Sequence, residues 1–159
     1  EGRMKTALYV ATVARTYRKA IDDYLEDPEK YKANMEWYKE EIGKCTYREF
    51  TTGFYFGKPG SDAQIYNSNT YVKNYTYLGT VEEADGKGRC RIEQKNKFSV
   101  GETIEIMKPD GRNLEVVVKS ICDEDGNEQE SAPHPKQILW VDLGADVDKY
   151  DILRKKEDN

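Results

Sequence analysis

The sequence is poor in the residues that hold metals and activate nucleophiles. Its 159 residues include three Cys and one His, which cannot supply a conventional Cys/His zinc finger or the four thiolates of an iron–sulfur cluster. Cys45, Cys90 and Cys122 are far apart and odd in number, which indicates a reducing compartment rather than a disulfide framework. We therefore expect a cytoplasmic protein with no metal site in this chain.

Long apolar runs and an excess of positive charge are also lacking. No stretch approaches the roughly 20 apolar residues of a membrane span, so we expect no membrane association. The 30 Asp and Glu residues outnumber the 25 Lys and Arg residues, and the net charge of -5 argues against nonspecific nucleic-acid binding of the histone kind. The length suits a single ordinary domain, or a small domain with an appendage.

The only His is flanked by two prolines. In Ala132-Pro133-His134-Pro135 the prolines favour an extended surface backbone with little freedom to bring the imidazole to a nucleophile. No nucleophile elbow, phosphate-binding glycine loop or metal-binding helix motif occurs elsewhere in the sequence. We therefore predict no catalytic residue, and a histidine that packs on the rim of the fold.

Residues 1–49 have helical periodicity and form a predicted helical linker. Apolar residues recur at steps of three and four, as on one side of an amphipathic helix. They are Ala7, Val10, Ala14, Tyr17, Ile21 and Tyr24. Arg18 falls inside this stripe, so we expect its guanidinium to snorkel or to pair with a carboxylate from elsewhere. Asp27-Pro28-Glu29 predicts the start of a second helix, and Gly43 predicts its end.

From residue 50 the helical period gives way to other patterns. Residues 50–69 form a predicted aromatic connector, in which Phe54-Tyr55-Phe56 lies between Gly53 and Gly57. Residues 70–159 contain six predicted strands separated by turn sequences, at 71–82, 89–98, 103–107, 114–122, 137–143 and 150–154. Because closure removes vulnerable edge strands, we predict an α+β fold in which two N-terminal helices precede a small six-stranded C-terminal β-barrel.

One predicted strand concentrates positive charge. Alternation over residues 89–98 places four cations on one face, next to a fifth that precedes the strand, and tyrosines alternate along the preceding strand. Aromatic rings beside cations suit single-stranded nucleic acid. The RNA-binding candidates are Lys87, Arg89, Arg91, Lys95, Lys97, Tyr75 and Tyr77. A charged outer barrel face over an aromatic core gives the same pattern, and on these residues alone we favour that interpretation.

Five segments, spread from residue 1 to the last strands, match the motifs of one known family with their spacing kept. They are Glu1-Gly2-Arg3-Met4-Lys5, Tyr17-Arg18-Lys19-Ala20-Ile21-Asp22, Thr52-Gly53-Phe54-Tyr55-Phe56-Gly57, Ile92-Glu93-Gln94-Lys95-Asn96-Lys97-Phe98 and Ala132-Pro133-His134-Pro135. With these motifs the chain resembles the C-terminal region of peptidase family U32, the collagenase-like peptidases. One departure is Thr46-Tyr47-Arg48, where family members often carry Ser-His-Arg, so no role of that His is carried over.

The resemblance implies a longer parent protein. Its N-terminal catalytic domain would end near residues 1–3 and hold an iron–sulfur cluster, whereas no cofactor is expected in this chain. The predicted barrel would be similar to the second barrel domain of translation elongation factors. The branch that carries it resembles proteins that form 5-hydroxyuridine in the tRNA anticodon loop, with prephenate implicated in the chemistry. The implied partners are the N-terminal catalytic domain of the same protein and tRNA.

These implications define one leading hypothesis and two alternatives. We expect a noncatalytic accessory domain that helps to position RNA for wobble-uridine hydroxylation by the upstream domain. The alternatives are a substrate-recognition domain of a U32 protease and a purely structural or interaction barrel. Candidate contacts with the upstream domain are Arg3, Arg18, Phe54, Tyr55 and Phe56. We also expect unusual exposure along the first helix, or a contact with another molecule that hides it.

Overall fold

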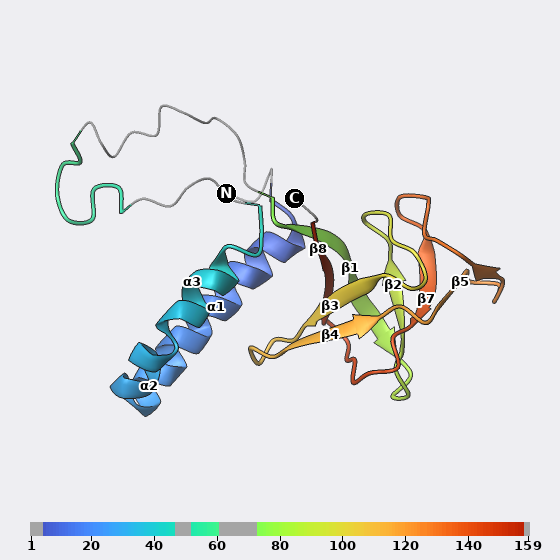
Figure 1. Ribbon diagram of the computed structural model, residues 1–159, viewed down its shortest axis with the longest axis horizontal. Coiled ribbons are helices and arrows are strands. Elements are labelled where there is room, and N and C mark those ends of the chain that lie inside the picture. Colours follow the sequence, from blue (N-terminus) through green and yellow to red (C-terminus); the bar gives the residue numbers. More distant parts are fainter. Residues whose placement is uncertain (1–4, 47–51, 61–72, 158–159) are drawn as a thin grey trace.

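The computed structural model describes residues 5–46, 52–60 and 73–157. A hairpin of helices extends to one side of a curled antiparallel sheet (Figure 1). The helices are α1 (Ala7–Glu26), α2 (Pro28–Ala33) and α3 (Met35–Ile42). Among the described residues, none of the helices is both long enough and apolar enough to cross a membrane.

The helices begin and end near the predicted positions, except that the second predicted helix is divided at Asn34. Thr6 occupies the N-cap position of α1, but its side chain makes no capping hydrogen bond. The Asp27 carboxylate accepts a hydrogen bond from the backbone N–H of Glu29 at 2.9 Å, which confirms the predicted second start. The expected second helix is nevertheless broken at Asn34, because the Asn34 side-chain amide donates to Asp23 of α1 at 2.9 Å.

The predicted α+β fold, with helices before an antiparallel sheet, is confirmed, but the number of six strands is wrong, because the described residues form eight strands in one curled sheet. The strands are β1 (Tyr75–Ala84), β2 (Arg89–Glu93), β3 (Thr103–Met107), β4 (Asn113–Val117), β5 (Ser120–Cys122), β6 (Glu128–Gln129), β7 (Ile138–Asp142) and β8 (Ile152–Lys156). Their order in the sheet is β4-β3-β8-β1-β2-β7-β5-β6, with β4 and β6 at its two ends. The likeness to an elongation-factor barrel stays a prediction.

The extra strands arise where the chain crosses between the two halves of the sheet. The backbone N–H of Val118 bonds to Glu102 next to β3, whereas that of Lys119 bonds to Asp142 of β7. The expected strand 114–122 is therefore divided into β4 and β5, which pair with different partners. The short β6 pairs with β5 in a segment for which no strand was predicted.

Two groups of buried side chains hold the molecule together. The larger group lies within the sheet and includes Phe98, Ile106, Leu139 and Leu153. The smaller group joins α1 to the sheet and consists of Leu8, Cys45, Tyr77, Met107 and Ile152. Burial of such apolar side chains is the main force that keeps the first helix against β3 and β8.

Candidate nucleic-acid interface and docking surface

β2 carries only the first half of the predicted basic face. Arg89, Arg91 and Glu93 lie on the outer side, and Cys90 and Ile92 are fully buried. The strand ends at Glu93, because the backbone N–H of Gln94 bonds to Gln137 and that of Lys95 bonds to Leu78. Lys95 and Lys97 therefore lie beyond the strand, but the predicted alternation of burial continues to Phe98 except at Asn96: Gln94 and Phe98 are buried, and Lys95 and Lys97 are exposed.

The cations of this region fall into two groups. The Arg91 guanidinium pairs with Glu82 and lies 3.3 Å from Glu124. Lys95 pairs with Glu93, and this hydrogen bond raises the pKa of the ammonium group. By contrast, Lys87, Arg89 and Lys97 are exposed and make no ion pair with the residues that the structure describes.

Arg89 makes one aromatic contact. Its guanidinium lies 5.9 Å from the centre of the Trp140 ring on the neighbouring β7, a cation–π geometry. This contact leaves the guanidinium at the surface, where a phosphate can approach it. We define Lys87, Arg89 and Lys97 as the open cations.

The two candidate tyrosines on β1 face the helices instead of solvent. Tyr77 is 9% exposed, belongs to the group that joins α1 to the sheet, and its hydroxyl lies 2.8 Å from Thr80 Oγ1. Tyr75 is half-buried, with the Arg154 guanidinium 5.1 Å from its ring centre. Tyr77 is too buried to stack on a base, whereas Tyr75 lines an open pocket with Glu105 and Lys155, so a stacking role of Tyr75 stays a prediction.

Tyr150 is the exposed aromatic residue that sequence reasoning missed. Its side chain is 68% exposed, and the Lys149 ammonium lies 5.2 Å from the ring centre. Its backbone has a φ of 75°, a left-handed conformation that is common for glycine and rare for a bulky residue. The ring lines two grooves, one with Arg91 and Lys95 and one with Ala14 and Met107. No sequence pattern marks this conformation, because Tyr is not a residue that favours it.

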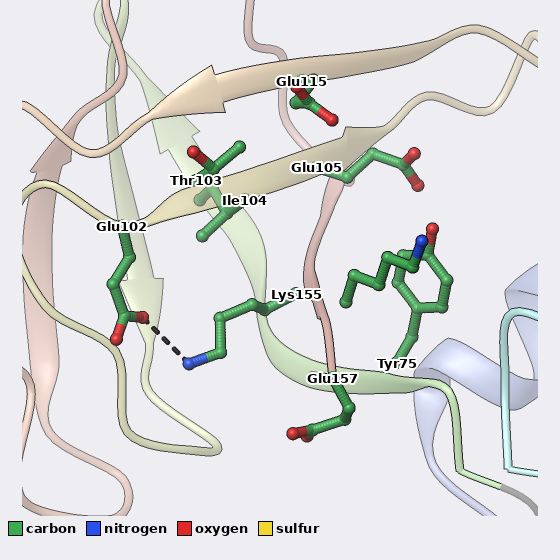
Figure 2. A pocket seen from close by; sticks show the side chains of 9 residues that line it. Tyr75, Glu102, Thr103, Ile104, Glu105, Glu115, Lys155 and Glu157 are labelled. Atoms are coloured by element: carbon green, nitrogen blue, oxygen red, sulfur yellow. Dashed lines mark hydrogen bonds and ion pairs between the residues drawn. The ribbon is translucent and has the colours of Figure 1, made fainter. Parts of the chain in front are cut away.

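A pocket across β3, β4 and β8 has the opposite charge character (Figure 2). Four glutamates line it against two lysines, and the Lys155 ammonium is already bonded to Glu102 at 3.0 Å. The carboxylates of Glu105, Glu115 and Glu157 surround the same hollow (Figure 2). Three of these glutamates are already ion-paired, Glu102 with Lys155, Glu105 with Arg154 and Glu157 with Lys73. Carboxylates still outnumber cations in the lining, so this pocket is less suited to a phosphate than the exposed cations near β2.

The buried arginine of α1 is Arg15, not Arg18. Arg18 is exposed and its Nε donates to Asp22 of the same helix at 2.8 Å, so its guanidinium reaches the surface, which is the first of the two expected outcomes. Arg15 instead points toward the sheet, where it pairs with Glu41 and donates to the Lys108 carbonyl at 2.8 Å. The sequence did not single out Arg15, because helical periodicity shows which residues share a face but not which face packs against the rest of the chain.

Arg15 belongs to a buried ion cluster between the helices and the sheet. We call Arg15, Glu41, Glu105 and Arg154 the helix–sheet ion cluster; they come from α1, α3, β3 and β8. Arg154 donates to Glu41 at 2.6 Å and to Glu105 at 2.5 Å, and its side chain is 0% exposed. Burial alone would raise the pKa of Glu41, but the two guanidinium groups hold it below its usual range.

Large apolar side chains of the helical part are exposed. Val10, Tyr17, Ile21 and Tyr24 of the predicted stripe face solvent, with Tyr17 at 60% exposed. The aromatic connector is more open still, and its Phe54, Tyr55 and Phe56 are 77%, 85% and 83% exposed. The prediction of unusual exposure along the first helix is therefore confirmed for Val10 and Tyr17. Arg3 lies outside the described residues.

The thiols and the imidazole are not arranged for chemistry. Burial raises the pKa of Cys45 to about 11 and that of Cys90 to about 12, so both remain protonated at neutral pH. Among the described residues, no three His, Cys, Asp or Glu side chains are grouped so as to hold a metal ion. His134 is exposed, as expected for the surface backbone that its flanking prolines favour.

Two family models match the chain. The model described as "Peptidase family U32" matches residues 1–65, and "Peptidase family U32 C-terminal domain" matches residues 73–154. A crystal structure of the C-terminal domain from a Geobacillus thermoleovorans protein assigned to the U32 peptidases is 32% identical, with a TM-score of 0.47; the match covers 52% of this chain and 92% of that one.

Curated relatives match almost the whole chain. It is 37% identical over 156 residues to tRNA hydroxylation protein P1 of Bacillus subtilis, which covers 98% of this chain and 37% of the relative. It is 28% identical over 157 residues to tRNA hydroxylation protein P of Escherichia coli, covering 98% and 34%. An uncharacterized protease of Methanocaldococcus jannaschii is 32% identical over 127 residues, covering 76% and 30%.

The helical segment and the curled sheet therefore correspond to two consecutive family models, and together they define the C-terminal region of a larger class of proteins. This chain belongs to peptidase family U32 and contains the C-terminal domain of that family. It spans about a third of the length of the curated relatives that it matches.

Proposed function

We propose that this chain is the noncatalytic C-terminal region of a tRNA-modifying U32 protein, in which it helps to position RNA for wobble-uridine hydroxylation by an upstream domain. The observation that carries the proposal is the 37% identity to tRNA hydroxylation protein P1 across 98% of the chain. The Escherichia coli relative bears a similar name and matches over the same share of the chain. We propose further that its partners are the upstream catalytic domain of the same protein and tRNA, and that the protein is cytoplasmic.

In this proposal the iron–sulfur cluster is bound by the upstream domain and not by this chain. Cys45 and Cys90 do not fit a cluster, since they lie in two different groups of buried side chains and, among the described residues, no three possible ligand side chains are grouped to hold a metal ion. Cys122 is half-buried on β5. We therefore assign this chain no step in the redox chemistry.

The open cations and Tyr150 supply the chemistry of an RNA contact. Lys87, Arg89 and Lys97 make no ion pair with a described carboxylate, although Asp85 lies near the first two, whereas Arg91 and Lys95 are already paired. Phosphate contacts of this kind position a nucleic acid without reading its sequence. The exposed Tyr150 ring adds a surface on which any base can stack. Such a contact orients the substrate and is strongly salt-dependent.

Nucleoside analysis of tRNA tests the proposal. We expect that deletion of the gene for the full-length protein removes the hydroxylated wobble uridine from total tRNA, measured by mass spectrometry after digestion to nucleosides. The wild-type gene should restore the nucleoside, and a gene carrying Lys87→Ala, Arg89→Ala and Lys97→Ala should restore it only in part. An unchanged nucleoside level in the deletion strain would show the proposal to be wrong.

A substrate-recognition role in a protease is the second candidate, and one observation favours it. The Methanocaldococcus jannaschii relative is named an uncharacterized protease and is 32% identical over 127 residues. In that case the full-length protein should cleave peptides in a way that depends on this region, while the tRNA nucleosides of the deletion strain stay unchanged.

A further inference from the structure

α1 buries mainly polar side chains against the sheet and against α2 and α3, and exposes most of its large apolar ones. Its buried residues are Leu8, Thr12, Arg15, Thr16 and Asp23, whereas five of its large apolar residues are exposed. We call the outward set the outer face of α1; it consists of Val10, Tyr17, Ile21, Tyr24 and Leu25. Contiguous exposed apolar side chains on one helix face are typical of a surface that another protein surface covers.

The polar inner side of α1 makes most of its hydrogen bonds and ion pairs within this chain, although Arg15 Nε is buried without a partner among the described residues. The Asp23 carboxylate accepts hydrogen bonds from Tyr38 at 2.6 Å and from Asn34 at 2.9 Å, which fixes α1 against α3. Arg15 enters the helix–sheet ion cluster, and Thr12 Oγ donates to the Met107 sulfur at 3.6 Å. The helix is thus held in place without its outer face, which leaves that face free for a second contact.

The exposed apolar residues are concentrated in one segment of the chain. Among the described residues, every large exposed apolar side chain except Val100, Val117 and Tyr150 lies within residues 1–65. These residues match the "Peptidase family U32" model, whereas the sheet matches the separate C-terminal model. The curated relatives continue for about twice the length of this chain beyond the part that they share with it.

We propose that the outer face of α1 is the surface on which the upstream domain of the same polypeptide packs, with Phe54, Tyr55 and Phe56 adding to the contact. The inference rests on the proposed function only for the presence of that domain. The helix–sheet ion cluster joins α1 to the sheet (Figure 1), so a domain that packs on the outer face of α1 is fixed relative to the sheet. The C-terminal sheet is consequently carried at a set orientation and does not swing on a linker.

Cysteine labelling of a surface position tests this packing directly. In a Cys122→Ser background, Ile21→Cys reports on the outer face and Val117→Cys on β4 is the matched control, since the two side chains are 49% and 51% exposed. In the 159-residue chain we expect both thiols to react with a maleimide at similar rates. In the full-length U32 protein we expect the Ile21→Cys thiol to react at least ten times more slowly, and the Val117→Cys thiol to be unaffected.

Three results would overturn the inference. Equal labelling rates of the two thiols in the full-length protein would show that nothing covers the outer face. Protection of Ile21→Cys in the 159-residue chain that increases with protein concentration would identify a second copy as the occupant. Protection that a Tyr17→Glu substitution in the full-length protein leaves unchanged would place the contact elsewhere. Labelling needs no tRNA, so loss of the proposed RNA function would leave this measurement intact.

Discussion

Tyr150 combines an exposed ring with a left-handed backbone, and the two properties can be separated by substitution. Tyr150→Gly and Tyr150→Ala both remove the ring, but only glycine tolerates a φ of 75° without strain. We expect the glycine variant to be more stable than the alanine variant by about 1 kcal/mol in urea unfolding. Both variants should bind tRNA more weakly in the full-length protein. Unchanged tRNA affinity in both would remove Tyr150 from the RNA surface.

Gly88 is required by a close approach of two backbone segments. Its φ is 101°, and a Cβ at this position would lie 2.8 Å from the Gly144 Cα, where no flexible side chain can give way. We expect Gly88→Ala to lower the free energy of unfolding by about 2 kcal/mol or more. Gly86→Ala is the control, because Gly86 also has a positive φ but meets nothing within 4 Å. Equal losses in the two variants would show that backbone strain alone matters here.

The helix–sheet ion cluster should make the attachment of the helices sensitive to acid. The Glu41→Gln variant leaves Arg15 and Arg154 buried with one carboxylate fewer, so we expect a loss of about 3 kcal/mol at pH 7. The pKa of Glu41 is lowered in the folded state, so its contribution is full above its ordinary pKa of 4.5 and is lost as the pH falls below that value. Wild-type stability should therefore fall more steeply below pH 4.5 than that of the variant. Glu115→Gln, at an exposed position on β4, is the control and should change neither the stability at pH 7 nor the loss of stability below pH 4.5.

The contact between Tyr38 and Asp23 should make the helical hairpin sensitive to alkali. Burial and the Asp23 carboxylate raise the pKa of Tyr38 from 10.0 to about 12. Its contribution to stability is therefore full below pH 10 and is lost as the pH rises toward 12. We expect Tyr38→Phe to reduce the loss of helical circular dichroism between these values, compared with Tyr24→Phe. Cys45 and Cys90 titrate in the same range, so the informative quantity is the difference between the two variants.

Local signals predicted the elements better than their connections. Asp27-Pro28 and Gly43 marked the ends of the α2–α3 segment, and the strand at 103–107 agrees with β3. The break at Asn34 depends on a hydrogen bond to Asp23 of another helix, which no local pattern contains. The division of the strand at 114–122 depends on bonds from Val118 and Lys119 to opposite halves of the sheet. Contacts between distant residues decided each of these points.

The same limit explains the outcome for the candidate sites. Alternation correctly placed Arg89 and Arg91 on the outer side of β2, but it could not show that the strand ends at Glu93. The apolar stripe of α1 was visible in the sequence, whereas its outward direction follows from the buried partners of Arg15 and Asp23. Tyr150 was missed because its exposure and its backbone conformation depend on the surrounding fold.

At the scale of the whole molecule, charge is divided between different sides of the sheet. The pocket on β3, β4 and β8 is lined by four glutamates, whereas the open cations belong to β2 and its flanking residues. In an acidic chain with a net charge of -5, this division directs a polyanion toward one side without giving it a high affinity. The outer face of α1 lies in the helical hairpin and is available to a different partner.

The open cations should carry the salt dependence of tRNA binding by the full-length protein. Each lost contact with a single-stranded phosphate lowers the slope of log affinity against log salt by roughly 0.7, so Lys87→Ala, Arg89→Ala and Lys97→Ala together should flatten it by about 2. Arg91→Ala with Lys95→Ala should change the slope less, since Glu82 and Glu93 already neutralise those two cations. Binding titrations over a range of KCl concentrations compare the two variants, and unfolding in urea confirms that both remain folded. If the triple variant keeps the wild-type slope while the paired-cation variant loses it, RNA contacts the ion-paired groove and not the open cations.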